Sequence, residues 1–309
     1  MKNVKKLGID MGNSTICVAG ANIKGEIVKA YTNSVYSLDT ALISGDVVTF
    51  NGLSLALGVG QTTLTNIDKT NREHIEHQIL WGVNAIYGSG THYIQLGVGL
   101  PIGIYKAKKQ EYAEKLKGIH TIEGVINGKE ISVNLVDVKV FAEGHASIKT
   151  LSNYIDKDNT TLIIDIGMKT TDVLLVEYNG KFTITNFGTT NIALYDIYKV
   201  LQDKIAEQGV DVTIEYIDKK FNSKKPIIRT EKGDFDLKEH LNDTVHVCRD
   251  IMKDIENKFG KTILHDKVFT GGGSEKFLRA VRGSVANNID IPTDMRYYSN
   301  ALGYLLNLA

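Results

Sequence analysis

The 309-residue sequence holds only two cysteines, Cys17 and Cys248, and three prolines. Two cysteines give no disulfide framework, so a reduced, cytoplasmic setting is expected. Because prolines are few and no Pro-rich linker occurs, we expect helices rather than a flexible tether between the halves of the chain. No stretch approaches the roughly 18 uninterrupted apolar residues of a membrane-spanning helix, and no signal-peptide processing site follows the basic N-terminus.

The sequence also lacks a surplus of either charge, since 36 Lys and Arg residues balance 36 Asp and Glu residues. Such a chain is a poor candidate for direct, tight binding to DNA or to an anionic membrane, because both favour a basic surface. The hydrophobic content of 42% and the charged content of 23% are ordinary for a globular protein. The length predicts about two domains.

The sequence does contain one phrase twice. Residues 8–25 read GIDMGNSTICVAGANIKG, and residues 163–180 read IIDIGMKTTDVLLVEYNG. Each copy predicts a β-hairpin that consists of an apolar strand, an Asp-x-Gly turn and a second apolar strand. Carboxylates and main-chain N–H groups at two such tips suit a metal-bound polyphosphate. We therefore predict a nucleotide cleft between two related halves, in which Asp10 matches Asp165, Gly12 matches Gly167 and Thr15 matches Thr170.

A third element lies near the C-terminus. A predicted strand over 267–270 leads into Gly271-Gly272-Gly273-Ser274, where Ser274 is placed to cap a helix over 275–285. Glycines let a flat base or a ribose approach the main chain beside a helix N-terminus. One Asp-x-Gly turn is a weak signal, but two in register followed by this element are far more specific.

Apolar periodicity predicts the other elements. Strands dominate residues 4–60, and residues 209–240 are polar enough to form a small inserted subdomain. Further strands are expected near 94–99 and 133–141. Apolar residues at helical spacing predict helices over 71–87, 105–117, 143–155, 194–205 and 241–259.

In this order the motifs resemble those of the actin and hexokinase-like ATPase superfamily. Within it, GVGLPIGIYKAKKQEYAEKLKG at 97–118 and VKVFAEGHASI at 138–148 are similar to the bacterial ParM/StbA plasmid-segregation proteins. The resemblance assigns the first phosphate motif to Leu7–Val18, the second to Leu162–Val176 and the adenosine motif to Val268–Phe277. Two connecting helices are expected to begin near Glu143 and Ser299.

The resemblance implies an α/β, actin-like fold in which two RNase H-like domains flank a nucleotide cleft, each with a smaller inserted subdomain. The first domain is expected to span 1–158 plus 290–309, with its small subdomain at about 33–70. The second is expected to span 159–289, with its small subdomain at about 209–240.

The resemblance also implies roles for residues. Asp10 and Asp165 are expected to hold Mg²⁺ through water, and Glu143 and Asp165 are the expected catalytic residues, Glu143 orienting or activating the attacking water. From the residues alone, Glu143 follows an apolar strand at a predicted helix start, where a carboxylate is favoured. Capping that helix is the alternative role. The expected nucleotide-binding residues are Asp10, Gly12, Asn13, Ser14, Gly167, Met168, Lys169, Thr170, Gly271, Gly272, Gly273 and Ser274.

Two departures from the pattern of actins concern charge. Cys17 stands where actins commonly carry a Lys that points at the phosphates, and Met168-Lys169 replaces the later glycines of the second loop. Our hypothesis is that Lys169 restores the missing positive charge from the opposite loop. The departure leaves the preference for ATP over GTP open.

The resemblance implies a filament-forming ATPase that uses ATP, with GTP as the alternative, and Mg²⁺. Its expected partners are further copies of itself and a DNA-binding adaptor of the ParR type; neutral charge agrees with an indirect link to plasmid DNA and with no membrane partner. The alternative is a small-molecule kinase or phosphatase of the same fold, but the acidic pair that we expect of its second pocket is not evident in 33–70. A chaperone-like or cell-division member is a third alternative.

Overall fold

The structure is a computed structural model that describes residues 3–22, 24–41, 45–60, 62–63 and 69–308. The chain divides into two units. Unit 1 comprises Met1–Asn153 and Tyr297–Ala309, and unit 2 comprises Tyr154–Arg296. The sequence-based boundaries at 158 and 290 thus lie five and seven residues from these divisions.

Unit 1 is built on one large mixed sheet, in which the described residues form ten strands in the order β3-β2-β1-β8-β10-β9-β5-β6-β4-β7. β1 and β2 form an antiparallel hairpin, and β8 pairs in parallel with both β1 and β10. The strands are β1 (Val4–Met11), β2 (Thr15–Ala21), β3 (Ile27–Asn33), β4 (Val35–Ser37), β5 (Asp46–Phe50), β6 (Leu53–Leu57), β7 (Thr62–Thr63), β8 (Gly90–Leu100), β9 (Thr121–Ile126) and β10 (Lys129–Ala142).

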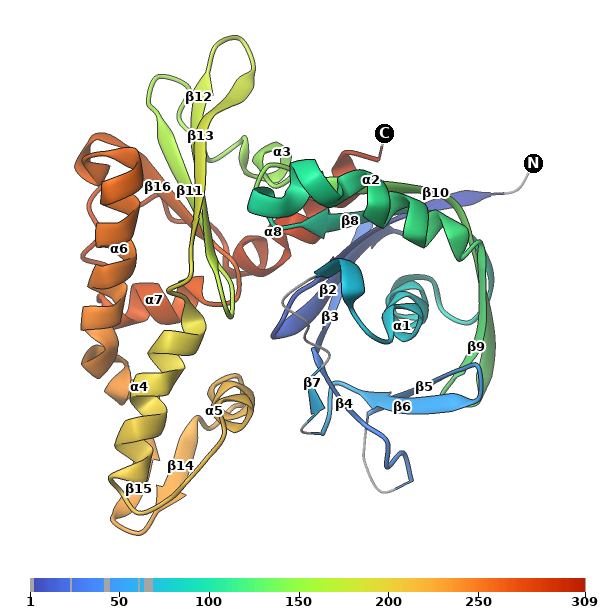
Figure 1. Cartoon of the computed structure of the whole chain (residues 1–309), viewed down its shortest axis with the longest axis horizontal. Helices are drawn as coiled ribbons and strands as arrows, with labels where there is room; N and C mark the ends of the chain where they lie inside the picture. The colour runs from blue at the N-terminus through green and yellow to red at the C-terminus, as the bar shows by residue number, and fades with distance from the viewer. Residues whose placement is uncertain (1–2, 23, 42–44, 61, 64–68, 309) are drawn as a thin grey trace. The chain divides into compact units, whose positions relative to one another are not determined.

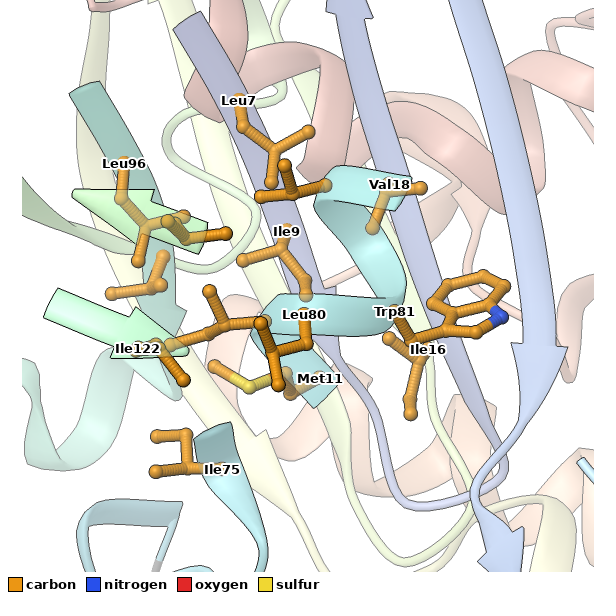
Figure 2. Packing of buried hydrophobic residues seen from close by; sticks show 14 of the residues in the cluster. Leu7, Ile9, Met11, Ile16, Val18, Ile75, Leu80, Trp81, Leu96 and Ile122 are labelled. Atoms are coloured by element: carbon orange, nitrogen blue, oxygen red, sulfur yellow. The ribbon is translucent and has the colours of Figure 1, made fainter. Parts of the chain in front are cut away.

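Helices cover this sheet and complete its core. α1 lies within the curve of the sheet (Figure 1), and α2 packs on β10. Side chains of β1 and β2 gather around α1 (Figure 2), and those drawn include Leu7, Ile9, Met11, Ile16, Val18, Leu80 and Trp81. The helical elements are η1 (Lys69–Asn71), α1 (Ile75–Tyr87), α2 (Ile102–Gly118), α3 (Ile148–Leu151) and α8 (Thr293–Leu306), which begins in unit 2 and continues in unit 1.

Alternation along β1 decides where its acidic residue points. Successive side chains of a strand face opposite sides of the sheet, so Ile9 enters the core under α1 while Gly8 and Asp10 face the other side. At Gly8 the main chain of α8 passes so close that a Cβ atom would lie 2.1 Å from the carbonyl oxygen of Ala301. The Asp10 carboxylate is therefore directed toward α8.

Unit 2 repeats the β3-β2-β1-β8 part of the sheet of unit 1. Its sheet has the order β13-β12-β11-β16, and α4, α6 and α7 lie along one side of it (Figure 1). A separate hairpin, β14–β15, lies beside α5 (Figure 1). The elements are β11 (Thr161–Ile166), β12 (Thr171–Tyr178), β13 (Phe182–Thr190), α4 (Leu194–Ala206), α5 (Ile214–Phe221), β14 (Ile227–Thr230), β15 (Gly233–Asp236), η2 (Glu239–Thr244), α6 (Val245–Phe259), η3 (Thr262–Leu264), β16 (Asp266–Thr270) and α7 (Ser274–Ala280).

The repeated phrase is a structural repeat. β3-β2-β1-β8 and β13-β12-β11-β16 share strand order, and in each the last pair is parallel and the others antiparallel. Asp10 pairs with Cys17 across the first hairpin, and Asp165 pairs with Asp172 across the second. The α/β, actin-like organisation expected from the sequence is confirmed at this level.

Three local predictions were wrong. The helix expected over 143–155 is reduced to α3, because Gly144 adopts a left-handed φ of 72° and Ser147 Oγ donates to the Gly144 carbonyl oxygen at 2.6 Å, a bond that competes with helix formation. Ser274 is the first residue of α7 rather than its cap, and the helix expected near Ser299 begins at Thr293. No helix within the described part of the chain is long and apolar enough to cross a membrane.

Candidate functional site

The site in unit 1 is organised by Asp10 and α8. Asn300, on α8, donates from its side-chain amide to Asp10 Oδ2 at 3.4 Å. The side-chain oxygen of Asn300 accepts the main-chain N–H of Gly144 at 2.9 Å. One amide therefore connects the end of β1 with the turn that follows Glu143, two segments that the sequence separates by more than a hundred residues.

Lys69 lies between the two acidic side chains of this site. Its Nζ forms a short ion pair with Glu143 Oε1 and lies 3.6 Å from Asp10 Oδ1. The side chains of Lys69 and Glu143 are each 10% exposed, and that of Asp10 is 19% exposed. Burial alone would lower the pKa of Lys69, but the charges of Glu143 and Asp10 outweigh it and hold that pKa above its ordinary value.

Arg72 supplies a second buried cation. Its Nη1 donates to the carbonyl oxygen of Gly12 at 3.0 Å, and its Nη2 donates to Asn13 Oδ1, also at 3.0 Å. Arg72 is 3% exposed, and among the described residues its Nε has no hydrogen-bond partner. The guanidinium thus holds the hairpin tip, and its Nε–H remains as a buried donor that a ligand could engage.

Neighbouring elements hold these side chains in place. Lys115 on α2 donates from its Nζ to the carbonyl oxygen of Thr70 at 2.6 Å, which fixes η1 and with it Lys69. At the hairpin tip, Ser34 Oγ donates to the Gly12 carbonyl oxygen at 2.6 Å. A Cβ atom at Gly12 would lie 2.6 Å from the carbonyl oxygen of Thr15, so the tight turn requires glycine there.

Glu143 follows the last residue of β10 and is 7% exposed. Its main-chain N–H donates to the carbonyl oxygen of Leu100 at 2.9 Å, so its position is set by the ends of two parallel strands. A Cβ atom at Gly99 would lie 3.1 Å from Glu143 Cγ and would clash with Tyr304, so Gly99 leaves room for both. The expected support from a helix start is absent, because the described helix α3 begins only at Ile148.

The site in unit 2 is built around Asp165, which is 8% exposed at the end of β11. The glycine-rich turn passes directly beside it, because a Cβ atom at Gly271 would lie 2.2 Å from Asp165 Oδ1. Gly271 also has φ of 83°, a conformation that favours glycine. The N–H of Gly273 donates to the carbonyl oxygen of Ile166 at 2.9 Å, which joins this turn to the second hairpin tip.

The second tip differs from the first in its side chains. The N–H of Gly167 donates to the carbonyl oxygen of Thr170 at 2.9 Å and closes the turn. Met168 packs against the core of unit 2, whereas Lys169 is exposed. The carbonyl oxygen of Met168 accepts the N–H of Tyr195, near the start of α4, at 2.8 Å.

The glycine-rich turn also contacts a buried lysine. Lys276 Nζ donates to Asn222 Oδ1 at 2.9 Å and to the carbonyl oxygen of Gly272 at 3.3 Å. Lys276 is 1% exposed, and this burial lowers its pKa. Ser274 Oγ donates to the Gly271 carbonyl oxygen at 2.7 Å, so its hydroxyl stabilises the turn itself.

The donor and acceptor sets fit a metal-bound polyphosphate. Carboxylates that hold a hydrated cation are present at Asp10 and Asp165, and buried cations that attract phosphate are present at Lys69 and Arg72. Several buried polar atoms of the described residues have no hydrogen-bond partner, and two of them lie at these sites: Arg72 Nε in unit 1 and, in unit 2, Thr270 Oγ1, whose residue pairs with Asp165. A bound phosphate or water would satisfy such atoms.

The sequence reasoning missed Lys69, Arg72, Asn300 and Lys276. The first loop itself lacks a cation, as Cys17 indicated, but two cations reach it from residues 69–72, outside every recognised motif. The only available signal was Lys69 and Arg72 within one short segment before a helix. Lys169 as a phosphate ligand stays a prediction.

Comparisons with known proteins agree with this arrangement. Residues 8–145 match the family described as actin like proteins N terminal domain. Residues 163–282 match the archaeal actin homologue MreB-like C-terminal family. No sequence among curated proteins matches the chain.

Solved structures are similar over nearly the whole chain. A 15-stranded ParM filament from Clostridium botulinum has a TM-score of 0.76 at 18% identity and covers 100% of this chain and 99% of its own. An archaeal actin homologue has a TM-score of 0.78 at 16% identity, with 98% of each chain covered. The same homologue in complex with ADP has a TM-score of 0.75 at 16% identity, again with 98% of each chain covered. With an actin-like N-terminal domain and an MreB-like C-terminal domain, the chain belongs to the actin-like proteins.

Proposed function

We propose that this protein is a filament-forming ATPase of the ParM type that acts in the cytoplasm. The observation that carries the proposal is the double occurrence of one arrangement: an acidic residue at the end of a buried strand, followed by a glycine turn, in each unit of an actin-like fold. Neighbouring structures support the two parts of this function, because one is a filament and another holds ADP.

Different residues of the two sites would bind different parts of the magnesium nucleotide. Asp10 and Asp165 would hold Mg²⁺ through water, and the main chain at 12–14 and 167–170 would donate hydrogen bonds to the phosphates. The turn at 271–274 accommodates the ribose and the base. When bound, the magnesium nucleotide supplies the bond to be cleaved and the cation that neutralises the leaving phosphate.

Glu143 orients the attacking water and accepts its proton. This role is supported by its burial, by its place at the ends of β8 and β10, and by the space that Gly99 leaves around it. A Glu143→Gln substitution should retain nucleotide binding and slow hydrolysis at least about a hundredfold, because the amide cannot accept the proton.

Filament growth and disassembly would move DNA through an adaptor of the ParR type. The equal numbers of acidic and basic residues support an indirect link to DNA, because a neutral chain gains little from the phosphate backbone. In this cycle the bound nucleotide favours assembly, and hydrolysis weakens the polymer.

Sedimentation of the purified protein with ATP or GTP, with and without magnesium, tests the proposal. A polymer pellet that depends on a nucleotide and magnesium is the expected result. A soluble protein that instead phosphorylates a small metabolite would contradict it and would favour a small-molecule kinase of the same fold.

A further inference from the structure

The inference concerns Lys69 and rests on the proposed function of the same site. In the structure, one ammonium group serves two carboxylates: it pairs with Glu143 and lies 3.6 Å from Asp10. Each of these acids has a proposed role with the nucleotide. The buried lysine therefore stands at the point where metal, phosphate and water would meet in unit 1.

The contacts of Lys69 weaken the roles proposed for Glu143 and Asp10, because the ammonium competes with water and metal for the two carboxylates. While its Nζ is paired with Glu143 Oε1, the positive charge favours the ionised carboxylate and makes it a weaker base toward water. A polyphosphate carries more negative charge than one carboxylate and attracts the ammonium more strongly. The lysine side chain has a flexible four-carbon stem. Its Nζ can therefore move a few ångströms to a new partner without movement of the main chain.

The surroundings allow such an exchange. The main chain around Lys69 is held by Lys115, which donates to the carbonyl oxygen of Thr70. Arg72 is committed to Gly12 and Asn13, so it would stay in place as the fixed cation at the hairpin tip. Within the residues that the structure describes, Lys69 has an ion-pair partner that it can exchange, whereas Arg72 forms hydrogen bonds to the hairpin tip.

We propose that Lys69 is an exchangeable counterion: in the nucleotide-free protein it pairs with Glu143 and lies beside Asp10, and it transfers to the phosphates when nucleotide binds. The transfer provides the positive charge that Cys17 does not. The transfer also frees Glu143 from its ion pair only when a nucleotide is present. Glu143 can therefore act as the proposed base only in the nucleotide-bound protein. Lys69 is thus a phosphate-binding residue as well as a structural one.

A double-mutant cycle on nucleotide affinity tests this exchange without measuring turnover. The proteins are the wild type, Lys69→Met, Glu143→Gln and the double variant, with fluorescent ATP as the probe. Lys69→Met should weaken binding about tenfold to a hundredfold, since it removes a charge-assisted contact. Lys129→Met, at an exposed position on β10, is the matched control and should change affinity by less than about twofold.

The sign of the coupling distinguishes exchange from a permanent pair. If Lys69 leaves Glu143 when nucleotide binds, then Glu143→Gln tightens binding because no ion pair must be broken, and this gain is larger with Lys69 present than in the Lys69→Met background. If Lys69 stays on Glu143, the gain is larger without Lys69, because only then is the carboxylate an uncompensated charge beside the phosphates. That second result would overturn the proposal, as would wild-type affinity in Lys69→Met.

Two further conditions keep the outcome unambiguous. If Lys69→Met does not fold, Lys69→Gln takes its place, because an amide still donates to Glu143 while lacking the charge. A wild-type protein that binds no nucleotide would overturn the proposed function together with this inference. A wild-type protein that binds ATP but shows the opposite coupling would overturn the inference alone.

Discussion

The guanidinium of Arg72 donates to the carbonyl oxygen of Gly12 at 3.0 Å, and this contact joins the segment before α1 to the first hairpin tip. Its second bond, to Asn13, fixes the next residue of the tip. Through these two bonds the guanidinium is held beside the tip. Its positive charge makes the tip an environment that favours an anion.

Replacing Arg72 should therefore affect both stability and nucleotide binding. Arg72→Gln leaves the Gly12 carbonyl with one donor fewer in a buried place, which should cost about 1–3 kcal/mol of unfolding free energy. Nucleotide affinity should fall as well, because a fixed positive charge is lost. Denaturant unfolding and nucleotide titration measure the two effects, and Arg229→Gln on β14, an exposed site, should change neither.

Gly271 offers a second test, with a matched control elsewhere in unit 2. Gly271→Ala places a Cβ atom 2.2 Å from Asp165 Oδ1 at a φ of 83°, whereas Gly180→Ala has nearly the same φ, 77°, and no atom within 4 Å. Both substitutions should cost about 1–2 kcal/mol for the left-handed conformation, and Gly271→Ala should cost more because of its clash. Equal stability of the two variants in urea would contradict the close approach of this turn to Asp165.

Asp165 could be predicted from the sequence and Lys69 could not, and the difference shows which site residues a sequence reveals. The hairpins, the glycine-rich turn and the acids at the ends of strands were predictable, because strand alternation and glycine turns are local patterns. Lys69, Arg72 and Asn300 were not, because each reaches the site from a segment distant in sequence. The short α3 was also unpredictable, since apolar spacing does not report that Gly144 adopts a left-handed conformation.

Two buried histidines of unit 1 predict a dependence of stability on pH. His77 is 2% exposed with Nε2 3.1 Å from the Leu53 carbonyl oxygen, and His92 is 5% exposed. Burial lowers the pKa of both. Below the unfolded pKa of about 6.5 the unfolded chain then binds more protons than the folded chain, so stability falls as the pH drops through that value.

The measurement is the free energy of unfolding in urea between pH 7.5 and pH 5.5. Each histidine can contribute at most about 1.4 kcal/mol per pH unit to its slope. His77→Gln should flatten the slope, because it removes one of the two buried groups that take up protons on unfolding. A slope that His77→Gln does not alter would rule out His77 as its source.

The cysteines should be unreactive in the folded protein. Burial raises the pKa of Cys17 to about 12, with a contribution from the charge of Asp10, and burial raises that of Cys248 to about 12. Because the thiolate is the reactive form, iodoacetamide at pH 8 should modify neither residue in the native state and both in guanidinium chloride. Rapid native modification of Cys17 would show that the first hairpin opens to solvent.

The most direct test of the central claim is the time course of light scattering after addition of ATP and magnesium. We predict that scattering of the wild-type protein rises as filaments grow and decays as ATP is consumed, while scattering of Glu143→Gln rises and stays high because hydrolysis is slowed. Electron microscopy of the same samples identifies the scattering species. Absence of any ATP-dependent rise in the wild-type protein would contradict a nucleotide-dependent filament.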